Sequence, residues 1–522
     1  MSANGEPPLR PLLVPAGIAL MLVSISLARP VSESPGLVSS LQIAAGLLLA
    51  ATLGIAALAH RSGRVLRIRF VPVRAHWVQI LMHASLYAGW APFFPAVVEH
   101  VPHIATQILF YYAFDLLLSW SRRDEARTGF GPIPIVGSVN LFLWFRDDWF
   151  LLQFAMLAAG VVAKEFLVWE REGRRSHVFN PSSFPLFLVC TALWIGGGDG
   201  LTFAGEIAGT QGEVPYGWLG IFLLALVVQS LFAVTLVTLG ALVSLYLANA
   251  VFTAWTGVYA WVDVGIPVAV YLGCHFLITD PATSPRTERG RAVFGALYGL
   301  AVFVLYVWLR EVGGPAYYDK LLCVPFLNLL VRRLDRLGGA LAGGSKNLAH
   351  VGGAVLLYLF FIRTGFLGES HPGQRIAFWE QACSESRWHG CEAQASLLEQ
   401  ACHAGEWPRC GQYARLQEAG TGVPRDRADA GYHYTLACQR GVDSACAAIP
   451  RFRVEGGDDA LREACNAGRG LSCLVLGTLE TGTLGGPVDA AGAEARFHRA
   501  CELDVPEACE FLDARAVAEP GR

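Results

Sequence analysis

Apolar segments succeed one another from residue 11 to residue 365, and this succession limits the fold of the chain more than any other feature. Only 16% of the residues are charged, against roughly 25% in an average soluble domain. A mean hydropathy of +0.42 over 522 residues cannot come from one buried core. The sequence therefore predicts an all-α fold, in which a polytopic helical membrane domain precedes a separate soluble domain.

The lengths of the apolar segments give the expected membrane spans, because a bilayer core of about 30 Å requires roughly 20 apolar residues of helix. The charge-free stretch 217–257 is too long for one such helix and fits two. Two short candidates, 131–145 and 316–331, are expected either to span or to be re-entrant. The thirteen candidate spans are 11–28, 36–59, 77–98, 104–120, 131–145, 149–168, 179–197, 216–235, 237–256, 259–279, 292–309, 316–331 and 347–365.

The basic residues of the loops indicate the orientation of these spans, because Lys and Arg remain preferentially in short cytoplasmic loops. With thirteen spans, every loop that carries several basic residues falls on one side of the membrane. Loops 99–103 and 198–215, which have no Lys or Arg, fall on the other side. We therefore expect the N-terminus inside, an uncleaved first helix rather than a signal peptide, and residues 366–522 outside. The basic loops are 60–76, 121–127, 171–175, 286–291 and 332–346.

Two short sequences place Pro directly after Asn or Asp at the edge of an apolar run, namely Asn180-Pro181 and Asp280-Pro281. Asx at the N-cap followed by Pro at the first helical position is a strong signal for a helix start. At membrane depth, such a start directs backbone N–H groups and the positive end of the helix dipole toward a site. Paired half-helix starts indicate a binding site between repeats, so we expect the two pairs to approach one another. The alternative is that both pairs only begin ordinary spans at the interface.

The residues around both pairs resemble one family, which comprises the RnfD protein of the Rnf electron-transport complex and the NqrB protein of the sodium-translocating NADH:quinone reductase. The resemblance covers roughly residues 75–335 and implies two inverted repeats that bind flavin within a redox-driven ion pump. The residues that carry it are Lys164-Glu165-Phe166, Phe179-Asn180-Pro181-Ser182-Ser183, Ile278-Thr279-Asp280-Pro281-Ala282-Thr283-Ser284-Pro285, Gly290-Arg291, Phe294-Gly295-Ala296-Leu297-Tyr298-Gly299 and Leu327-Asn328-Leu329-Leu330.

The resemblance makes FMN or riboflavin the expected cofactor, but the sequence departs from the family where FMN is attached covalently. The interval between the two Asx-Pro pairs offers only Thr210, without the expected order of residues around it, so we expect no covalent attachment. The shortened form is more similar to the Rnf-D-like membrane proteins of enediyne biosynthetic clusters. The expected cofactor-binding residues are Lys164, Asn180, Pro181, Ser182, Ser183, Thr279, Asp280, Pro281, Thr283 and Ser284.

Ionisable residues inside spans are expensive to bury and often functional. Asp115 lies in the middle of a predicted span, and we assign it to an ion or proton pathway. The alternative is a carboxyl group that a neighbouring helix satisfies. His83 and His275 are also predicted inside spans, whereas Lys164 and Glu165 near a cytoplasmic end are able to snorkel.

Ten of the thirteen cysteines follow residue 380, in five pairs that each have a separation of eight residues. Alanine precedes the first cysteine of a pair and glycine follows it three residues later, most clearly from Ala401 to Gly405. A helix that ends at one cysteine, a turn at Gly and a second helix that begins at the next cysteine account for this pattern. The domain resembles cysteine-rich Sel1-like repeats, with one disulfide in each repeat. The predicted pairs are Cys383–Cys391, Cys402–Cys410, Cys438–Cys446, Cys465–Cys473 and Cys501–Cys509.

Disulfides persist in oxidising compartments such as the periplasm, which agrees with the side of the membrane that the loop charges predict. Zinc is the alternative, but zinc sites favour two to four intervening residues with histidine partners, and we expect no metal. Repeat arrays present a concave face to partners, so we expect membrane or periplasmic proteins to bind there. A net charge of −3 argues against nucleic acid as a partner.

The sequence thus predicts a transmembrane hairpin at 1–75, a family-like membrane domain at 76–346, a final transmembrane helix at 347–366 and the repeat domain at 367–522. The expected function is that of a flavin-linked electron-transport protein in the bacterial inner membrane, with ion movement coupled to it. The alternatives are a channel or transporter, and a membrane-anchored scaffold that acts through its repeats.

Overall fold

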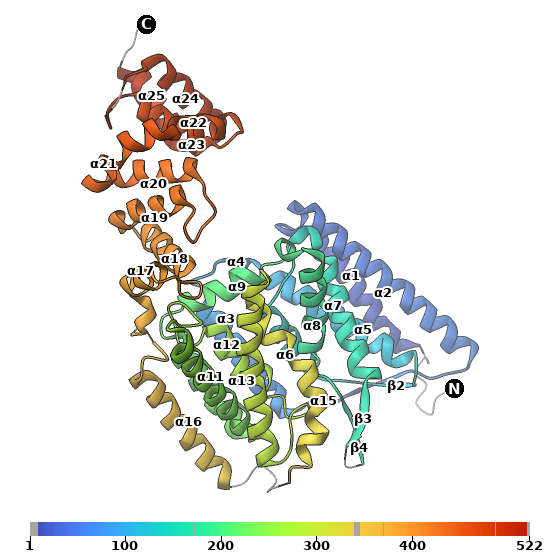
Figure 1. The fold of residues 1–522 in the computed structure, drawn as a ribbon. Helices are drawn as coiled ribbons and strands as arrows, with labels where there is room; N and C mark the ends of the chain where they lie inside the picture. The colour runs from blue at the N-terminus through green and yellow to red at the C-terminus, as the bar shows by residue number, and fades with distance from the viewer. Residues whose placement is uncertain (1–8, 172, 339–344, 369, 486, 519–522) are drawn as a thin grey trace. The chain divides into compact units, whose positions relative to one another are not determined.

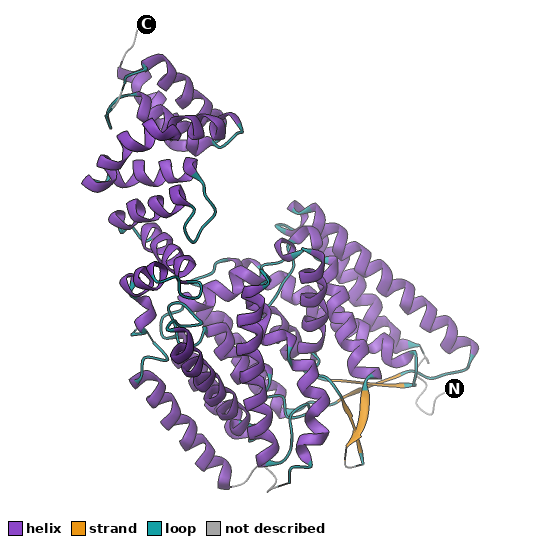
Figure 2. Cartoon of the chain, in the orientation of Figure 1, coloured by secondary structure: helices purple, strands orange, loops and turns teal. Residues whose placement is uncertain are grey.

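The computed structural model describes residues 9–518 apart from 172, 339–344, 369 and 486. Part of the predicted basic loop 332–346, including the side chain of Lys346, therefore lies outside the described residues. The chain forms two compact units. Unit 1 comprises residues 1–251 and 264–370, and unit 2 comprises residues 252–263 and 371–522. The described part of the chain is almost entirely helical, as the sequence predicts (Figure 2).

Unit 1 is a bundle of helices, several of which are long and apolar (Figure 1). Its helices are α1 (Leu13–Ser26), α2 (Pro35–Arg61), α3 (Arg74–Trp90), α4 (Ala96–Glu99), α5 (Val101–Trp120), α6 (Pro132–Asn140), α7 (Leu151–Phe166), α8 (Ser183–Gly196), α9 (Ala204–Thr210), α10 (Gly217–Phe232), α11 (Thr235–Thr256, whose end belongs to unit 2), α12 (Val268–Leu272), α13 (Glu288–Glu311), α14 (Asp319–Leu322), α15 (Val324–Asp335) and α16 (Ser345–Arg363). Short 3-10 turns join several of them, and a π-helical turn, Gly273–Leu277, continues α12.

The lengths of these helices confirm a multi-pass membrane protein but correct the list of spans. Within the described residues, four helices are long and apolar enough to cross a membrane, and a fifth if one bent pair is a single broken span. They are Pro35–Arg61, Ala96–Trp120 (α4 with α5), Thr235–Thr256 and Glu288–Glu311, and the bent pair is Ala204–Glu213 with Gly217–Phe232.

Three predicted spans, 131–145, 259–279 and 316–331, are wrong as continuous helices. The first contains only the nine-residue α6. The second begins irregularly and becomes helical at Val268, and the third is divided among a 3-10 turn, α14 and α15. Proline explains part of the difference, because Pro267 precedes α12 and Pro325 lies in the first turn of α15, where neither can continue a preceding helix.

Two short strand pairs, which the sequence analysis missed, lie at one end of unit 1 (Figure 2). β1 (Arg67–Phe70) pairs in parallel with β2 (Glu125–Thr128), and β3 (Val168–Arg171) pairs with β4 (Arg174–His177) as an antiparallel hairpin. All four strands come from loops that were predicted to be basic and cytoplasmic. Because β1 and β2 join two of these loops directly, the loops share one side of the bundle.

Glycine allows α11 and α13 to pack closely. A Cβ atom at Gly295 would lie 1.9 Å from the carbonyl oxygen of Val237, and one at Gly299 would lie 2.2 Å from that of Ala241. On the opposite helix, a Cβ at Gly240 would lie 2.3 Å from the carbonyl oxygen of Ala292. Small residues four apart let helix backbones approach closely in membranes, where hydrophobic burial gives little driving force for association.

Unit 2 is an array of helices in which a disulfide joins each of five pairs of successive helices, and one helix belongs to both of the first two pairs. Its helices are α17 (Ile376–Ser384), α18 (Gly390–His403), α19 (Trp407–Ala419), α20 (Arg427–Gln439), α21 (Asp443–Phe452), α22 (Asp458–Asn466), α23 (Gly470–Glu480), α24 (Ala490–Glu502) and α25 (Pro506–Ala518). The five predicted cysteine pairs all form, with Cα–Cα distances of 4.3 to 4.9 Å. The third residue after each first cysteine is left-handed, and these residues are Ser386, Gly405, Gly441, Gly468 and Asp504.

Unit 2 also contains residues 252–263, which the sequence analysis assigned to the membrane domain. The guanidinium of Arg387 donates a hydrogen bond to the carbonyl oxygen of Gly257 at 2.9 Å. The ring of Tyr259 lies 4.5 Å from that of His371, and Phe252 lies 4.9 Å from Trp388. The end of α11 and the connection after it therefore pack with the first helices of the repeat array.

The disulfide pattern gives a direct test. Non-reducing peptide mapping of the purified protein should find five linked pairs, each eight residues apart, because every pair is formed within one turn. The three buried thiols outside unit 2, Cys190, Cys274 and Cys323, should react with an alkylating reagent only after denaturation and serve as the internal control. Bridges between different turns, or free thiols in unit 2 with bound zinc, would contradict this assignment.

Candidate functional site

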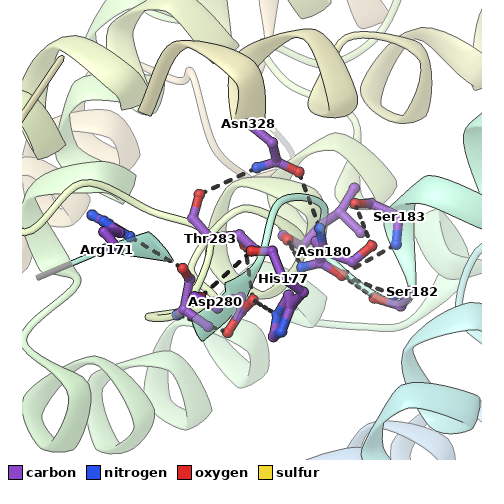
Figure 3. Close-up of polar contacts among 11 residues, drawn as sticks. Arg171, His177, Asn180, Ser182, Ser183, Asp280, Thr283 and Asn328 are labelled. Carbon is purple, nitrogen blue, oxygen red and sulfur yellow. Dashed lines mark hydrogen bonds and ion pairs between the residues drawn. The ribbon is translucent and has the colours of Figure 1, made fainter. Parts of the chain in front are cut away.

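The backbone segments at the two Asx-Pro pairs are joined by one buried side chain, that of Asn328 in α15 (Figure 3). Its Oδ1 accepts a hydrogen bond from the backbone N–H of Asn180 at 3.1 Å. Its Nδ2 donates to the carbonyl oxygen of Thr283 at 3.2 Å. The Asn180 Nδ2 donates in turn to the carbonyl oxygen of Leu277 at 3.1 Å. The two segments therefore meet, as the sequence predicts.

The first pair begins a helix in the expected way. The Asn180 Oδ1 accepts hydrogen bonds from the backbone N–H groups of Ser182, at 2.9 Å, and Ser183, at 3.2 Å. It also accepts from the Ser182 hydroxyl at 2.7 Å. Asn180 thus caps the turn at Pro181 and Ser182, which leads directly into α8 at Ser183.

The second pair does not begin a helix, which corrects the prediction for Asp280. The Asp280 carboxylate accepts from the Ala282 N–H at 3.1 Å and from the Thr283 hydroxyl at 2.8 Å, so it caps only a turn. The next helix, α13, begins at Glu288 behind Thr287, whose hydroxyl accepts from the Gly290 N–H. Proline alone does not account for the delay, because Pro185 lies at the same distance after Asn180 and α8 continues through it.

The turn after Asp280 is fixed from outside by Arg171 of β3, which is only 6% exposed. Its guanidinium donates to the carbonyl oxygens of Ala282 and Ser284 and to the carboxylate of Asp335 at 2.7 Å. A second Asp335 oxygen accepts from the Arg286 N–H at 2.7 Å. Three of the basic loops are therefore bonded to one another beside the site.

A cavity of about 420 Å³ lies between the two Asx-Pro segments, and α3, α6 and the end of α7 complete it. Of the ten predicted cofactor-binding residues, seven line it: Lys164, Asn180, Pro181, Ser182, Thr279, Asp280 and Pro281. The other three, Ser183, Thr283 and Ser284, support the walls instead. Ser183 and Thr283 bond to the Asx side chains or backbone, and the Ser284 carbonyl accepts from Arg171.

Histidines that the sequence analysis did not assign to the site also line this cavity. His76 and His83 come from α3, and His177 comes from the end of β4. His83 shares hydrogen bonds with the Gln79 carbonyl and the Ser138 hydroxyl, at 2.6 and 2.9 Å. His76, Gln79 and His83 have the spacing of one helix face, so a polar stripe on an apolar helix was the available signal.

The cavity contains a polar atom that has no hydrogen-bond partner within the described residues. His76 Nδ1 is buried and makes no hydrogen bond there, whereas His177 Nε2 lies at ion-pair distance, 3.7 Å, from the Asp280 carboxylate. The Lys164 Nζ lies 5.9 Å from the ring centre of Tyr111. In contrast, the backbone N–H groups of the Asx turns are already bonded. Side chains, not helix ends, therefore supply the groups that are open to a ligand.

A smaller cavity of about 260 Å³ adjoins the first, and the two share His76, Gly131 and Lys164. Asp115 of α5 and Arg127 of β2 line it together with these residues. The predicted ion-pathway residue thus lies beside the predicted cofactor residue Lys164, at the end of unit 1 where the basic loops meet.

Comparison with known proteins finds one family over part of this region. Residues 199–337 match the NQR2, RnfD, RnfE family. The match includes Asp280, Asn328 and Asp335, and it begins after Lys164 and Asn180.

Curated relatives match over shorter stretches. The chain is 45% identical over 71 residues to the D component of the ion-translocating oxidoreductase complex of Tolumonas auensis. These residues make up 13% of this chain and 18% of the relative. The same component from Sodalis glossinidius is 42% identical over 62 residues, 12% of this chain and 18% of the relative. That from Cellvibrio japonicus is 39% identical over 51 residues, 10% of this chain and 13% of the relative. The chain thus spans less than a fifth of the length of these relatives.

The bridge at Asn328 can be tested by substitution. Asn328→Leu leaves the Asn180 N–H and the Thr283 carbonyl without partners in a buried place, and an unsatisfied buried group costs about 1–3 kcal/mol. We expect a lower midpoint of thermal unfolding for the detergent-purified variant. The control is Asn347→Leu in α16, which removes a single hydrogen bond, to the Ser230 carbonyl, away from the site. An Asn328→Leu midpoint equal to that of the control would contradict the bridging role.

Proposed function

We propose that this protein is a membrane component of a flavin-linked electron-transport system, with ion movement coupled to electron transfer. One observation carries the proposal: the two Asx-Pro segments and Lys164 line a single cavity. The family match over residues 199–337 supports it, because the relatives are named as parts of ion-translocating oxidoreductase complexes.

The cavity suits FMN or riboflavin bound without a covalent bond. Its volume of about 420 Å³ falls in the usual range for small-molecule sites, and its lining combines apolar side chains with a few polar groups. His76 and His177 line the cavity, and Lys164 supplies a positive charge for a phosphate or a reduced ring. A bound flavin supplies electron transfer in one- or two-electron steps.

Thr210 supports the non-covalent reading. Its hydroxyl donates to the carbonyl oxygen of Glu206 at 2.7 Å and accepts from the Trp90 indole N–H at 3.1 Å. Both hydrogen-bonding functions of the hydroxyl are therefore used. Thr210 is also absent from the described lining of the cavity that contains Lys164.

Asp115 is the group we assign to ion or proton movement. Its carboxylate lines the adjoining cavity beside Lys164 and His76, which line the proposed flavin site as well. A change of charge on the flavin therefore acts over a short distance on a carboxylate in a weakly polar environment, where electrostatic interactions are strong. This arrangement couples the protonation of Asp115 to the redox state of the cofactor.

For unit 2 we propose a periplasmic location and a role in binding a membrane or periplasmic protein. The five disulfides favour an oxidising compartment, and the succession of disulfide-linked helices resembles a Sel1-like repeat array. The direct bonds among the basic loops support one shared cytoplasmic side for those loops in a bacterial inner membrane.

The flavin proposal is tested by the visible spectrum of the purified protein. We expect absorption near the flavin bands that acid precipitation releases into the supernatant, because no covalent bond holds the cofactor. Lys164→Met removes the charge but keeps most of the side-chain volume, and should lower the bound flavin about tenfold. The control, Lys320→Met combined with Asp319→Asn, removes a buried lysine outside the cavity together with the carboxylate with which it pairs.

Two outcomes would contradict the flavin proposal. A colourless protein that also fails to bind added FMN or riboflavin would falsify the redox proposal and leave transport or scaffolding as the function. Equal flavin content in the Lys164→Met variant and the control variant would place the cofactor elsewhere.

The orientation is tested by C-terminal reporters. Alkaline phosphatase fused after residue 522 should be active, because it folds only when exported, and a cytoplasmic reporter at the same position should be inactive. The reverse pair of results would refute the periplasmic location of unit 2. A reporter inserted in the described loop 121–124, on the side of the basic residues, is the control and should give the opposite pattern.

A further inference from the structure

A groove of about 590 Å³ lies between α2, α5 and α7 and shares no described lining residue with the two cavities that contain Lys164. The three helices lie side by side in unit 1, and α2 and α5 belong to the helices long and apolar enough to cross a membrane (Figure 1). The described lining is apolar except for the hydroxyl of Ser121. Small lining residues such as Ala51, Gly54 and Ala155 are exposed, so the groove opens toward the surrounding bilayer.

The dimensions of the groove fit a hydrocarbon chain and are too narrow for a whole helix. At 1.5 Å per residue, the lining extends about 21 Å along α2, from Ala44 to Leu58, and about 16 Å along α5, from Phe110 to Ser121. The volume divided by the longer length gives a mean cross-section of about 28 Å². A helix with its side chains is about 10–12 Å across, which corresponds to about 80–110 Å². A single acyl chain is much narrower, and one leaflet of the bilayer core is about 15 Å thick, close to the length of the groove.

One end of the groove is basic. Ser121, the last lining residue of α5, is followed directly by Arg122 and Arg123. Both guanidinium groups bind one carboxylate, that of Glu165, at 3.2 and 2.9 Å. Glu165 follows the lining residue Ala158 by seven residues, which places it on the same face of α7. A guanidinium has five N–H groups, and each of these two binds Glu165 through a single nitrogen, so donors remain for a phosphate.

Helix α2 contributes a third positive group at this end. Arg61 is its last residue and is exposed, and it lies three residues after Leu58 and seven after Gly54, on the face of α2 that lines the groove. The neighbouring ion pair of the same loops, Arg64 with Asp124 at 2.6 Å, is balanced in charge. The described groups that continue the three faces of the groove therefore carry more positive than negative charge.

We propose that this groove binds one molecule of an anionic phospholipid. An acyl chain occupies the apolar groove, and the phosphate accepts hydrogen bonds from the guanidinium groups of Arg61 and Arg122. Guanidinium groups form strong, charge-assisted hydrogen bonds with phosphate, and basic pockets at the ends of membrane helices bind anionic head groups. The excess of positive charge favours an anionic head group over a zwitterionic one. The proposal does not depend on the flavin site.

The chemistry is tested with the full-length protein in phosphatidylcholine nanodiscs that contain a trace of phosphatidylglycerol with a photoreactive diazirine on one acyl chain. After irradiation, the label should map to the peptides of α2, α5 and α7 that line the groove. Added phosphatidylglycerol should displace the label at about a tenfold lower mole fraction than phosphatidylethanolamine with the same chains. Inorganic phosphate should not displace it, because it buries no chain. Label spread evenly over the lipid-facing helices, or equal displacement by either competitor, overturns the proposal.

The head-group contact is tested by removing two charges. The double variant Arg61→Gln and Arg122→Gln should lower the labelling of the groove about tenfold, because the phosphate loses both partners. The matched control, Arg289→Gln with Arg333→Gln, removes two exposed arginines of other basic loops, outside the groove, and should keep the label. Equal labelling of the two double variants contradicts the proposed head-group site.

The position of the chain is tested by filling the groove. Gly54 lines it, and a Cβ atom there would meet nothing within 4 Å, so Gly54→Leu should fold and lose the label. Gly46→Leu, also in α2 and equally free of contacts but outside the described lining, should keep it. Label that persists in the Gly54→Leu variant places the lipid elsewhere. All variants should keep the flavin content of the parent, so that this result and the flavin result are read separately.

Discussion

Helical breaks inside an apolar bundle leave backbone N–H and C=O groups without partners, and no water is present in a bilayer to satisfy them. In unit 1 three side chains form hydrogen bonds with such backbone groups at the Asx-Pro segments. Asn180 and Asp280 each bond to the N–H groups that follow them, and Asn328 pairs with backbone atoms of both segments. These bonds stabilise the non-helical backbone of the two segments, and the cavity lies between them. The same bonds use the helix-end donors, so the proposed flavin site depends on Lys164 and the other side chains of the lining.

The features that the sequence predicts correctly are those set by residues close together in the chain. The cysteine pairs follow from a fixed separation of eight residues, and the cap at Asn180 follows from the next three residues. Asp280 has the same local signal, and a proline follows five residues on in both cases, yet its turn stops before a helix forms. Arg171 binds the carbonyl oxygens of Ala282 and Ser284 there, a contact that no local pattern predicts. Asn328 shows why the site could not be completed from sequence. It is one amide in an apolar run, and its partners are more than 40 residues away.

Loop charge predicts correctly that the basic loops lie together, but it does not predict their structure. These loops form two strand pairs and a set of bonds centred on Arg171 and Asp335. Residue composition predicts neither the strand pairs nor these bonds. The pairing of β1 with β2, for example, depends on two chain segments that α3 and α5 bring together. The grouping of residues 252–263 with the repeat array is likewise a tertiary effect. Aromatic contacts such as Tyr259 with His371 decide it, and hydropathy does not report them.

The placement of the disulfides within turns has a mechanical consequence. Each bridge closes a short loop at the turn between two helices, and within the described residues no bridge joins helices that are not successive in the chain. Tension applied along the array would therefore be carried between the stapled turns by helix packing alone. Under load the array would extend in steps, as one helix interface after another separated. Each disulfide-linked turn would stay closed and keep its two helices adjacent, so that they could pack again when the load was removed.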